Sequence, residues 1–426
     1  MSLSIKNIPS DWEFVKLSEL TSVITKGTTP TTNGFSYLKN GVNFVKVESI
    51  HSNGTFIPSK FAYVGNDCHN SFKRSQLYKD DILFTIAGAL GRSAIVEKNI
   101  LPANTNQAVA IIRLKNLDNK DYIFHYLRGN SIKKLIERIN VSTAQANLSL
   151  GQINNFKIPF PPLQEQQKIA EILSTVDAKI SIIDAQISET QNLKKGLMQS
   201  LLSKGIGHTE FKKSALGEIP KSWEVVEIGE IISELLAGVS VNSEDRESQI
   251  GEIGILKTSA LFSGKFSPKK HKTVIKKDIH RVKLNPLKNT ILISRMNTPL
   301  LVGECGFVDV DYPTLFIPDR IWMIKFSDDF NVSAKWLSYV LSSYTLRNQI
   351  KLIATGTSNS MKNISKPSLL GIKIIFPPLQ EQEKIASILS SVDEKLDVLS
   401  EKKSDYQNLK KGLMQQLLTG LVRVSV

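Results

Sequence analysis

The chain has 426 residues, 41% hydrophobic and 22% charged, which excludes an intrinsically disordered protein and predicts two globular domains of ordinary size. No apolar run approaches the roughly 18 residues that a membrane helix needs, and the first residues lack the apolar core of a secretion signal. We therefore expect a cytoplasmic protein without membrane contact.

The net charge of +14 is concentrated in two blocks of the chain. Residues 1–162 carry 19 basic and 11 acidic side chains, and residues 205–378 carry 23 and 17. The segments between and after them are nearly neutral: residues 163–204 carry 5 basic and 5 acidic side chains, and residues 379–418 carry 6 basic and 7 acidic side chains. Excess positive charge on two separate blocks favours an anionic partner for both.

Both blocks have the pattern of mixed α/β domains with many loops. In the first block, extended stretches are expected at 42–47, 81–87, 93–96 and 107–114, followed by a helix over 121–139. In the second block, they are expected at 252–257, 290–294, 301–308 and 320–326, followed by a helix over 334–353.

A repeated segment follows each block. Phe160-Pro-Pro-Leu-Gln-Glu-Gln166 recurs at 376–382 and Gln191–Gln199 recurs at 407–415, both at an offset of 216. Over the 44 positions from 160 to 203, 28 residues are identical in the two copies. The doubled proline ends an extended stretch and Glu165 falls in a first turn, which predicts a helix of about 40 residues and about 60 Å in each copy.

Apolar residues in both predicted helices alternate by three and four positions, which is the spacing of a coiled-coil seam. We expect the helices to pair antiparallel about a pseudo-twofold axis; the alternative is that each helix packs on its own block. The predicted interface residues are Gln164, Glu165, Gln166, Ile169, Leu173, Val176, Ile180, Ile183, Leu197, Gln380, Glu381, Gln382, Ile385, Leu389, Val392, Leu396, Leu399 and Leu413. The predicted order is a domain over 1–160, a helix over 161–204, a domain over 205–376, and a helix with a tail over 377–426.

The two blocks also begin alike, with Ile8-Pro-Ser-Asp-Trp-Glu13 and Ile219-Pro-Lys-Ser-Trp-Glu224. With these openings, Gly217-Glu-Ile-Pro220 and the repeated segments, the chain resembles the specificity subunit of type I restriction-modification enzymes along essentially its whole length. The resemblance implies two target-recognition domains in tandem, each reading one half of a bipartite, asymmetric site in double-stranded DNA. The paired helices would act as a ruler that sets the spacer.

The resemblance also implies partners. Two methyltransferase subunits are expected to dock, largely on the helices and their interface residues named above, together with restriction subunits that supply a motor and a nuclease. S-adenosylmethionine, ATP and Mg²⁺ are expected on those subunits, and no cofactor is expected on this chain.

Loops of the two blocks supply the candidates for DNA contact, because Arg, Lys, Asn, Gln, Ser and Thr match base edges and phosphates. For any single loop residue, an ordinary turn is the simpler interpretation. A run rich in lysine from Lys265 to Lys288 either contacts phosphates or is a solvated edge, and the sequence does not separate the two. The predicted residues are Lys26, Thr28, Thr29, Thr31, Asn33, Arg92, Asn104, Asn106, Gln107, Thr143, Gln145, Lys269, Lys270, Lys272, Arg295, Asn297, Arg320, Thr357, Asn359 and Lys362.

The sequence predicts no catalytic residue and no metal site. It lacks the Asn/Asp-Pro-Pro-aromatic motif of adenine methyltransferases and the phosphate-binding loop of an ATP-driven motor. The histidines are scattered, and Cys68 and Cys305 are expected to be reduced structural thiols. A self-contained methyltransferase-nuclease would need several hundred more residues, whereas a coiled-coil scaffold without DNA specificity leaves two basic blocks unexplained.

Overall fold

The computed structural model describes residues 8–139, 147–356 and 361–425, and the chain forms two compact units. Unit 1 comprises residues 1–186 and 399–426, and unit 2 comprises residues 187–398. Each unit therefore contains one predicted domain and parts of both long helices, α6 (Leu163–Lys204) and α11 (Leu379–Leu417). A long helix does not end where a compact unit ends, because its two halves pack into different cores.

Unit 1 is built on two sheets. The large sheet has the order β2-β8-β5-β6, with β2 (Thr21–Lys26), β8 (Val109–Leu114), β5 (Ile82–Thr85) and β6 (Ser93–Ile95). The small sheet has the order β4-β3-β7, with β4 (Ala62–Val64), β3 (Val42–Val45) and β7 (Ala103–Thr105). The other strands are the pair β1 (Glu13–Lys16) and β9 (Lys157–Phe160), and the α-helices besides α6 and α11 are α1 (Leu17–Leu20), α2 (Asn66–Ser71), α3 (Lys120–Leu127), α4 (Asn130–Ile139) and α5 (Leu150–Asn154).

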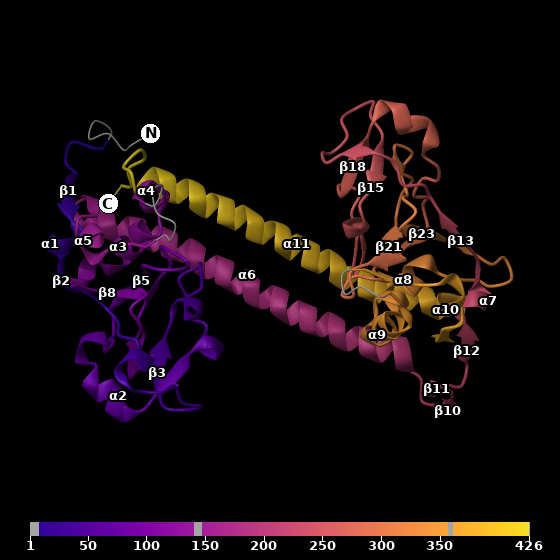
Figure 1. The fold of residues 1–426 in the computed structure, drawn as a ribbon, viewed down its shortest axis with the longest axis horizontal. Helices are drawn as coiled ribbons and strands as arrows, with labels where there is room; N and C mark the ends of the chain where they lie inside the picture. The colour runs from indigo at the N-terminus through magenta and orange to yellow at the C-terminus, as the bar shows by residue number, and fades with distance from the viewer. Residues whose placement is uncertain (1–7, 140–146, 357–360, 426) are drawn as a thin grey trace. The chain divides into compact units, whose positions relative to one another are not determined.

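The large sheet of unit 1 lies between two apolar cores. Side chains alternate along β5, so that Ile82 and Phe84 pack in the core formed with α3, α5 and α6, whereas Leu83 packs with the small sheet. Figure 1 shows α3 and α5 on one side of β2, β8 and β5, with β3 and α2 on the other. All four positions of β5 are buried, which is why this strand reads as a continuous apolar run.

Unit 2 repeats this topology and adds strands at one edge of each sheet. Its large sheet has the order β13-β23-β19-β21-β17-β16, with β13 (Ile232–Ala237), β23 (Ile321–Phe326), β19 (Thr290–Ser294), β21 (Cys305–Val308), β17 (Gly264–Phe266) and β16 (Leu261–Phe262). Its small sheet has the order β14-β18-β15-β22, with β14 (Ser243–Glu244), β18 (His271–Val274), β15 (Gly254–Leu256) and β22 (Leu315–Phe316). The other strand pairs are β12 (Glu224–Glu227) with β25 (Lys373–Phe376), β10 (Phe211–Ser214) with β11 (Gly217–Pro220), and β20 (Met296–Asn297) with β24 (Lys362–Asn363); the helices are α7 (Ile228–Ile231), α8 (Ala334–Ser342), α9 (Tyr344–Ile353) and α10 (Lys366–Leu370).

The correspondence extends to the strand pairing. The one parallel pair of the small sheet, β3 with β7, recurs as β15 with β22. The edge pair β2–β8 shifts register between Thr21 and Val23, and β13–β23 shifts between Ile232 and Glu234. The two blocks therefore share a fold although their sequences differ outside the repeated segments.

Each helix predicted at the end of a block is in fact two helices. The segment 121–139 is divided into α3 and α4 at Arg128 and Gly129, and 334–353 is divided into α8 and α9 at Ser343. The Ser343 hydroxyl accepts from the Leu346 amide and so caps α9. The apolar spacing runs through both breaks because all four helices face a core, which is why periodicity alone does not reveal them.

Both predicted modes of packing occur along the long helices. The first half of each helix docks on its own block, with Leu173 of α6 in the core of unit 1 and Leu389 of α11 in the core of unit 2. In unit 1, Lys410 and Lys403 of α11 form ion pairs with Asp177 and Asp184 of α6, which sets the two helices antiparallel there. The helix pair and the docked helix are therefore parts of one arrangement rather than alternatives.

Candidate nucleic-acid interface

One end of the large sheet gathers the loops that carry most of the predicted DNA-contacting residues. In unit 1, β2 ends there with Lys26 opposite Ala110, and β5 ends there with Thr85 opposite Val109. The loops that follow β2 and β5 and the loop that precedes β8 therefore leave the sheet at the same end of its strands. Loops held by a rigid sheet are a common way to present binding side chains.

The loop after β2 is held against the loop before β8 by its backbone. The Thr28 amide donates to the Thr105 carbonyl at 3.1 Å, and the Gly27 amide donates to the Val109 carbonyl at 3.3 Å. A Cβ on Gly27 would lie 2.0 Å from the Thr105 carbonyl oxygen, so no larger residue fits this approach. Because the two loops approach this closely, their side chains lie next to each other beyond the end of the sheet.

Four of the predicted residues of unit 1 lie close together at this end of the sheet. The Thr29 hydroxyl donates to Oε1 of Gln107, and Nδ2 of Asn33 donates to the Thr29 carbonyl at 2.9 Å. Arg74 donates to the Thr28 hydroxyl at 3.4 Å and brings a cation to the group. Arg74 was not predicted, because the basic pair Lys73-Arg74 in a polar stretch carries no pattern that distinguishes it.

Unit 2 brings together the predicted residues Arg295, Asn297, Arg320 and Lys362. The Arg295 amide donates to the Arg320 carbonyl at 3.0 Å, and the pairing of β20 with β24 places Asn297 opposite Lys362. The Ile364 amide donates to the Arg295 carbonyl at 2.9 Å. Three cations and an amide therefore lie on three adjoining segments that are far apart in the sequence.

The loop after β13 occupies in unit 2 the place of the loop after β2. A Cβ on Gly238 would lie 1.6 Å from the Ile317 carbonyl oxygen, which is the counterpart of the approach at Gly27. Beyond it, the Ser240 hydroxyl donates to the Asp319 carboxylate, and Nε of Arg295 donates to the Asp319 carbonyl at 2.7 Å. The two units thus present different side chains on an equivalent frame.

One predicted DNA-contacting residue, Asn104, belongs to the interior, and another, Arg92, binds a backbone carbonyl. Asn104 is fully buried on β7, where its amide contacts Ser75 and His69, so its side chain is not available to DNA. Arg92 is half-buried and donates to the Ile50 carbonyl at 3.0 Å, which fixes a neighbouring loop. The prediction for Asn104 was wrong, because a polar residue in a short buried strand resembles one in a loop; DNA contact by Arg92 stays a prediction.

The other predicted residues have different surroundings. Lys26, Thr31, Lys269 and Lys270 are exposed, and Asn106 accepts from the Ala108 amide in a turn. Lys272 lies 3.8 Å from Asp245, which also pairs with Lys257 at 2.6 Å. Thr143, Gln145, Thr357 and Asn359 lie outside the described residues.

The two repeated motifs of the sequence contact each other in both units. Nε1 of Trp12 donates to Glu165 at 3.0 Å, and Arg423 donates to both oxygens of the same carboxylate at 2.7 and 2.8 Å. In unit 2, Nε1 of Trp223 donates to Glu381 at 2.7 Å, and His208 lies 2.8 Å from the other oxygen. We call these two groups the clasps.

Each clasp holds the first turn of a long helix on its own block. Burial alone would raise the pKa of Glu381, but hydrogen bonds from the Ile206 amide, Trp223 and His208 hold it below its ordinary value. Gln382, which is fully buried, donates from Nε2 to the Pro377 carbonyl at 2.8 Å.

Glu165, Gln166, Glu381 and Gln382 were predicted at the interface with partner subunits or with the other helix. Arg423, which follows α11, does bind Glu165. Contact with partner subunits stays a prediction for all four residues. These side chains are buried or half-buried, and each of them bonds to groups within its own unit. Gln164 and Gln380, which also lie in the first turns, are exposed.

The predicted seam divides into two kinds of position. Ile169 and Leu173 in unit 1, and Ile385 and Leu389 in unit 2, are part of the block cores. Leu413 packs against the core of unit 1 and Leu197 against that of unit 2. The other predicted positions lie between these ends of the helices; five are buried and Leu396 is half-buried: Val176, Ile180, Ile183, Val392, Leu396 and Leu399.

Within residues 8–139, 147–356 and 361–425, no three His, Cys, Asp or Glu side chains are arranged to hold a metal ion. Cys68 and Cys305 are free and buried, and burial raises the pKa of the Cys305 thiol to about 12. In the same part of the chain, no helix is both long and apolar enough to cross a membrane.

A family model described as the type I restriction modification DNA specificity domain matches the chain twice, over residues 9–192 and 220–405. These matches cover most of both units. The chain belongs to this family. As a specificity protein of a type I restriction-modification system, it has two specificity domains in tandem, as the repeated motifs indicated.

Relatives along the full length support this assignment. The chain is 32% identical over 435 residues to a protein of Methanocaldococcus jannaschii described as the MjaX specificity subunit of a type I restriction enzyme, covering 99% of this chain and 96% of that protein. It is 28% identical to the MjaVIII specificity subunit of the same organism, covering 98% and 94%. The EcoKI specificity subunit of Escherichia coli is 24% identical, covering 90% and 82%.

Solved structures show the same fold. The S subunit of a type I restriction-modification system from M. genitalium has a TM-score of 0.60 at 16% identity, covering 98% of both chains. A chain from a structure that addresses complex assembly of the type I system has a TM-score of 0.56 at 19% identity, covering 97% and 99%.

Proposed function

We propose that this specificity protein reads a bipartite DNA site, with one half-site read by each unit. The observation that carries the proposal is that equivalent sheet ends present different polar side chains. Unit 1 offers Thr28, Thr29 and Gln107 with Arg74, whereas unit 2 offers Arg295, Asn297 and Lys362 with Arg320. Different side chains on one frame match the reading of two different base sequences.

Charge supports the same proposal. The two blocks carry all of the net positive charge, whereas the helix segments are nearly neutral. Positive charge on a reading domain lets it neutralise phosphates and approach any DNA duplex before the base edges are tested. The affinity for DNA should therefore fall steeply as salt increases, and the discrimination between sequences should depend on the sheet-end side chains.

The role of the helices in the proposal is to fix the spacer between half-sites and to offer a surface to two methyltransferase subunits, through which restriction subunits join. The clasps restrict that surface to the exposed positions of α6 and α11, such as Gln164, Gln380 and Leu193. The chain itself would act without catalysis in the cytoplasm, and S-adenosylmethionine, ATP and Mg²⁺ would be held by the partners.

The test is methylome sequencing of DNA from cells that express this chain with its neighbouring methyltransferase subunit, compared with the methyltransferase alone. New N6-methyladenine in a single bipartite motif is expected only when the chain is present. Loss of methylation at one half-site pattern after exchange of one sheet-end group, for example Arg295→Ala with Asn297→Ala, would assign that half-site to unit 2. An assembled complex that adds no methylation would favour a scaffold without DNA specificity.

A further inference from the structure

Each unit has a hairpin that a cation connects to the long helices. In unit 1 it is formed by residues 51–55, closed by the bridge between Ile50 and Phe56. In unit 2 it is formed by residues 262–265, closed by the pairing of Leu261 with Phe266. We call these hairpin 1 and hairpin 2; both follow the first strand of the small sheet that is paired in parallel.

Hairpin 1 packs directly against the end of α3. Gly54 has a φ of +94°, and a Cβ there would lie 2.8 Å from Cζ of Phe124 and 2.9 Å from Cζ of Arg128. The backbone of the hairpin can therefore approach the helix this closely only with glycine at this position. The Arg128 guanidinium also lies 4.8 Å from the centre of the Phe124 ring.

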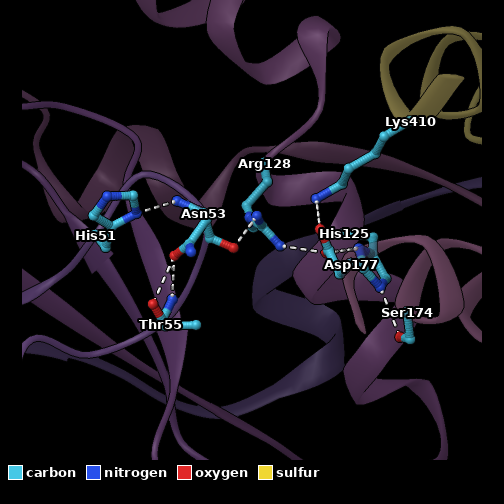
Figure 2. A network of polar contacts seen from close by, with 8 residues as sticks. All are labelled: His51, Asn53, Thr55, His125, Arg128, Ser174, Asp177 and Lys410. Atoms are coloured by element: carbon cyan, nitrogen blue, oxygen red, sulfur yellow. Dashed lines mark hydrogen bonds and ion pairs between the residues drawn. The ribbon is translucent and has the colours of Figure 1, made fainter. Parts of the chain in front are cut away.

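Asp177 of α6 connects this contact to α11. Arg128 donates to the Asn53 carbonyl of hairpin 1 and, at 3.2 Å, to Oδ2 of Asp177, while Lys410 of α11 donates to Oδ1 (Figure 2). Arg128 and Lys410 are both buried enough that desolvation lowers their pKa values, so Asp177 is the counter-charge of two buried cations. One carboxylate thus joins hairpin 1, α3, α6 and α11.

Hairpin 2 contacts the long helices through a cation of its own, Lys265, which pairs with aspartates of α11. Lys265 of the hairpin lies 2.6 Å from Asp397 and 4.0 Å from Asp393 of α11. Asp393 also accepts from Lys194 of α6 at 2.7 Å and from the Tyr339 hydroxyl at 2.9 Å. Here the hairpin supplies the cation, whereas in unit 1 the cation comes from Arg128 at the end of α3.

The two aspartates occupy one position of the repeat. Asp393 is Asp177 displaced by the repeat offset of 216, and Lys410 is Lys194 displaced by the same number. The connection from hairpin to helix pair is thus present twice. The two hairpins share a Gly-x-Phe-x-Pro pattern, at 54–58 and 264–268, but the cation comes from Arg128 in unit 1 and from Lys265 in unit 2. A contact reached twice by different side chains points to a requirement for the contact itself.

We infer that Asp177 and Asp393 are positioning residues for base recognition, each acting on the half-site read by its own unit. Hairpin 1 lies in the chain between β3 and β4 of the small sheet, and β7 of that sheet leads directly into Asn106 and Gln107 at the sheet end. Hairpin 2 is part of the large sheet of unit 2, in which β19 leads directly into Arg295. The angle at which the helix pair holds hairpin 1 is therefore passed to the residues that face the DNA. This inference rests on the proposed function and adds to it the residues that orient the reading surface.

The experiment uses the full complex with its methyltransferase subunit and duplexes that carry single substitutions in one half-site of the motif. Asp177→Asn is expected to reduce discrimination at half-site 1 by about tenfold, the order of one base-pair mismatch, and to leave half-site 2 unchanged. Asp393→Asn is expected to do the reverse. Asp177→Glu, which keeps the charge, should restore most of the loss.

Asp184→Asn is the matched control in unit 1. It removes the 2.6 Å ion pair with Lys403 from the same pair of helices, but that pair joins α6 to α11 without a group of the hairpin. It should leave discrimination at both half-sites as in the unmodified complex. Equal losses at both half-sites in Asp177→Asn, or the same loss in Asp184→Asn, would overturn the inference by showing a general loss of stability.

Discrimination by the unmodified complex distinguishes a failure of the proposed function from a failure of this inference. If the complex shows no preference at either half-site, the proposed function is wrong and the inference falls with it. If it does discriminate and Asp177→Asn leaves half-site 1 unchanged, the inference alone is overturned.

Discussion

The indole nitrogen of Trp12 donates a 3.0 Å hydrogen bond to the carboxylate of Glu165, which lies 153 residues further along the chain and is 2% exposed. Trp223 and Glu381 form the same contact at 2.7 Å in unit 2. The two most visible motifs of the sequence therefore bind each other, so their repetition reflects how each block is mounted on its helix.

Replacing Trp12 by Phe tests the energetic weight of this clasp. The change removes the donor to a buried carboxylate while keeping an aromatic ring, and we expect it to lower the free energy of unfolding by about 1–3 kcal/mol. Denaturant unfolding of the two proteins measures the difference. Trp336→Phe is the control, because Nε1 of Trp336 is buried without a hydrogen-bond partner, so it loses ring volume alone. Equal effects of the two substitutions would show that volume accounts for the loss.

Gly27→Ala should disturb the sheet end of unit 1. The added Cβ would lie 2.0 Å from the Thr105 carbonyl oxygen, so the loop that carries Thr28 and Thr29 has to move. We expect weaker discrimination at half-site 1 and a lower melting temperature. Gly196→Ala in α6, where nothing lies within 4 Å of the new Cβ, should change neither for the worse. A Gly27→Ala protein with normal discrimination would contradict the assignment of this loop.

The buried His125 predicts how stability depends on pH. Burial, assisted by Arg128 and Lys410 and opposed by Asp177, lowers the pKa of His125 from 6.5 to about 3. Between these values the unfolded chain binds a proton that the folded chain does not, so stability falls as pH falls below 6.5.

The contribution of His125 is about 1.4 kcal/mol for each pH unit well inside that window. His125→Gln removes this contribution. The difference in melting temperature between the two proteins should therefore be smaller at pH 5.5 than at pH 7.5. The same pH dependence in both proteins would show that His125 is not the group that titrates.

Asp245 holds two lysines of unit 2 by charge, and both are candidates for DNA contact. It pairs with Lys257 at 2.6 Å and lies 3.8 Å from Lys272 in an exposed loop of unit 2. Asp245→Asn should release both lysines, raise the affinity for random duplex DNA, and steepen the salt dependence by about 0.9 in slope for each phosphate gained. Glu247→Gln removes one charge from the same loop without touching these pairs, so a similar steepening there would exclude the lysines as the cause.

The sequence predicted the parts of the fold that have a local signature. The doubled proline and the apolar spacing indicated both long helices, which begin at Leu163 and Leu379, and the apolar runs indicated β5 and β8. The short strand β7 was missed, because its pairing in parallel with β3 is a contact between distant segments. For the same reason, Asn104 on β7 was interpreted as a loop residue although it is fully buried.

The sequence predicted which segments carry the candidate DNA-contacting residues, but not which of these residues lie next to one another. Arg295, Asn297 and Lys362 were all named from polar loops, and the pairing of β20 with β24 brings them together. Arg74 had no signal at all. The clasps did have one, because Trp12 and Glu165 recur as Trp223 and Glu381, and two motifs that repeat together are candidates for contact with each other.

The division of α11 between the units orders the assembly of the chain during synthesis. Unit 2 ends at residue 398, so every residue that it buries has been synthesised before residues 399–425 are added. Unit 1 buries Leu417 and Leu418 in its core and closes its clasp with Arg423. The domain that is translated first is therefore the last to receive all of its residues, and its core stays incomplete while its neighbour is synthesised. A nascent chain of this kind depends on unit 1 remaining soluble through the whole synthesis of unit 2.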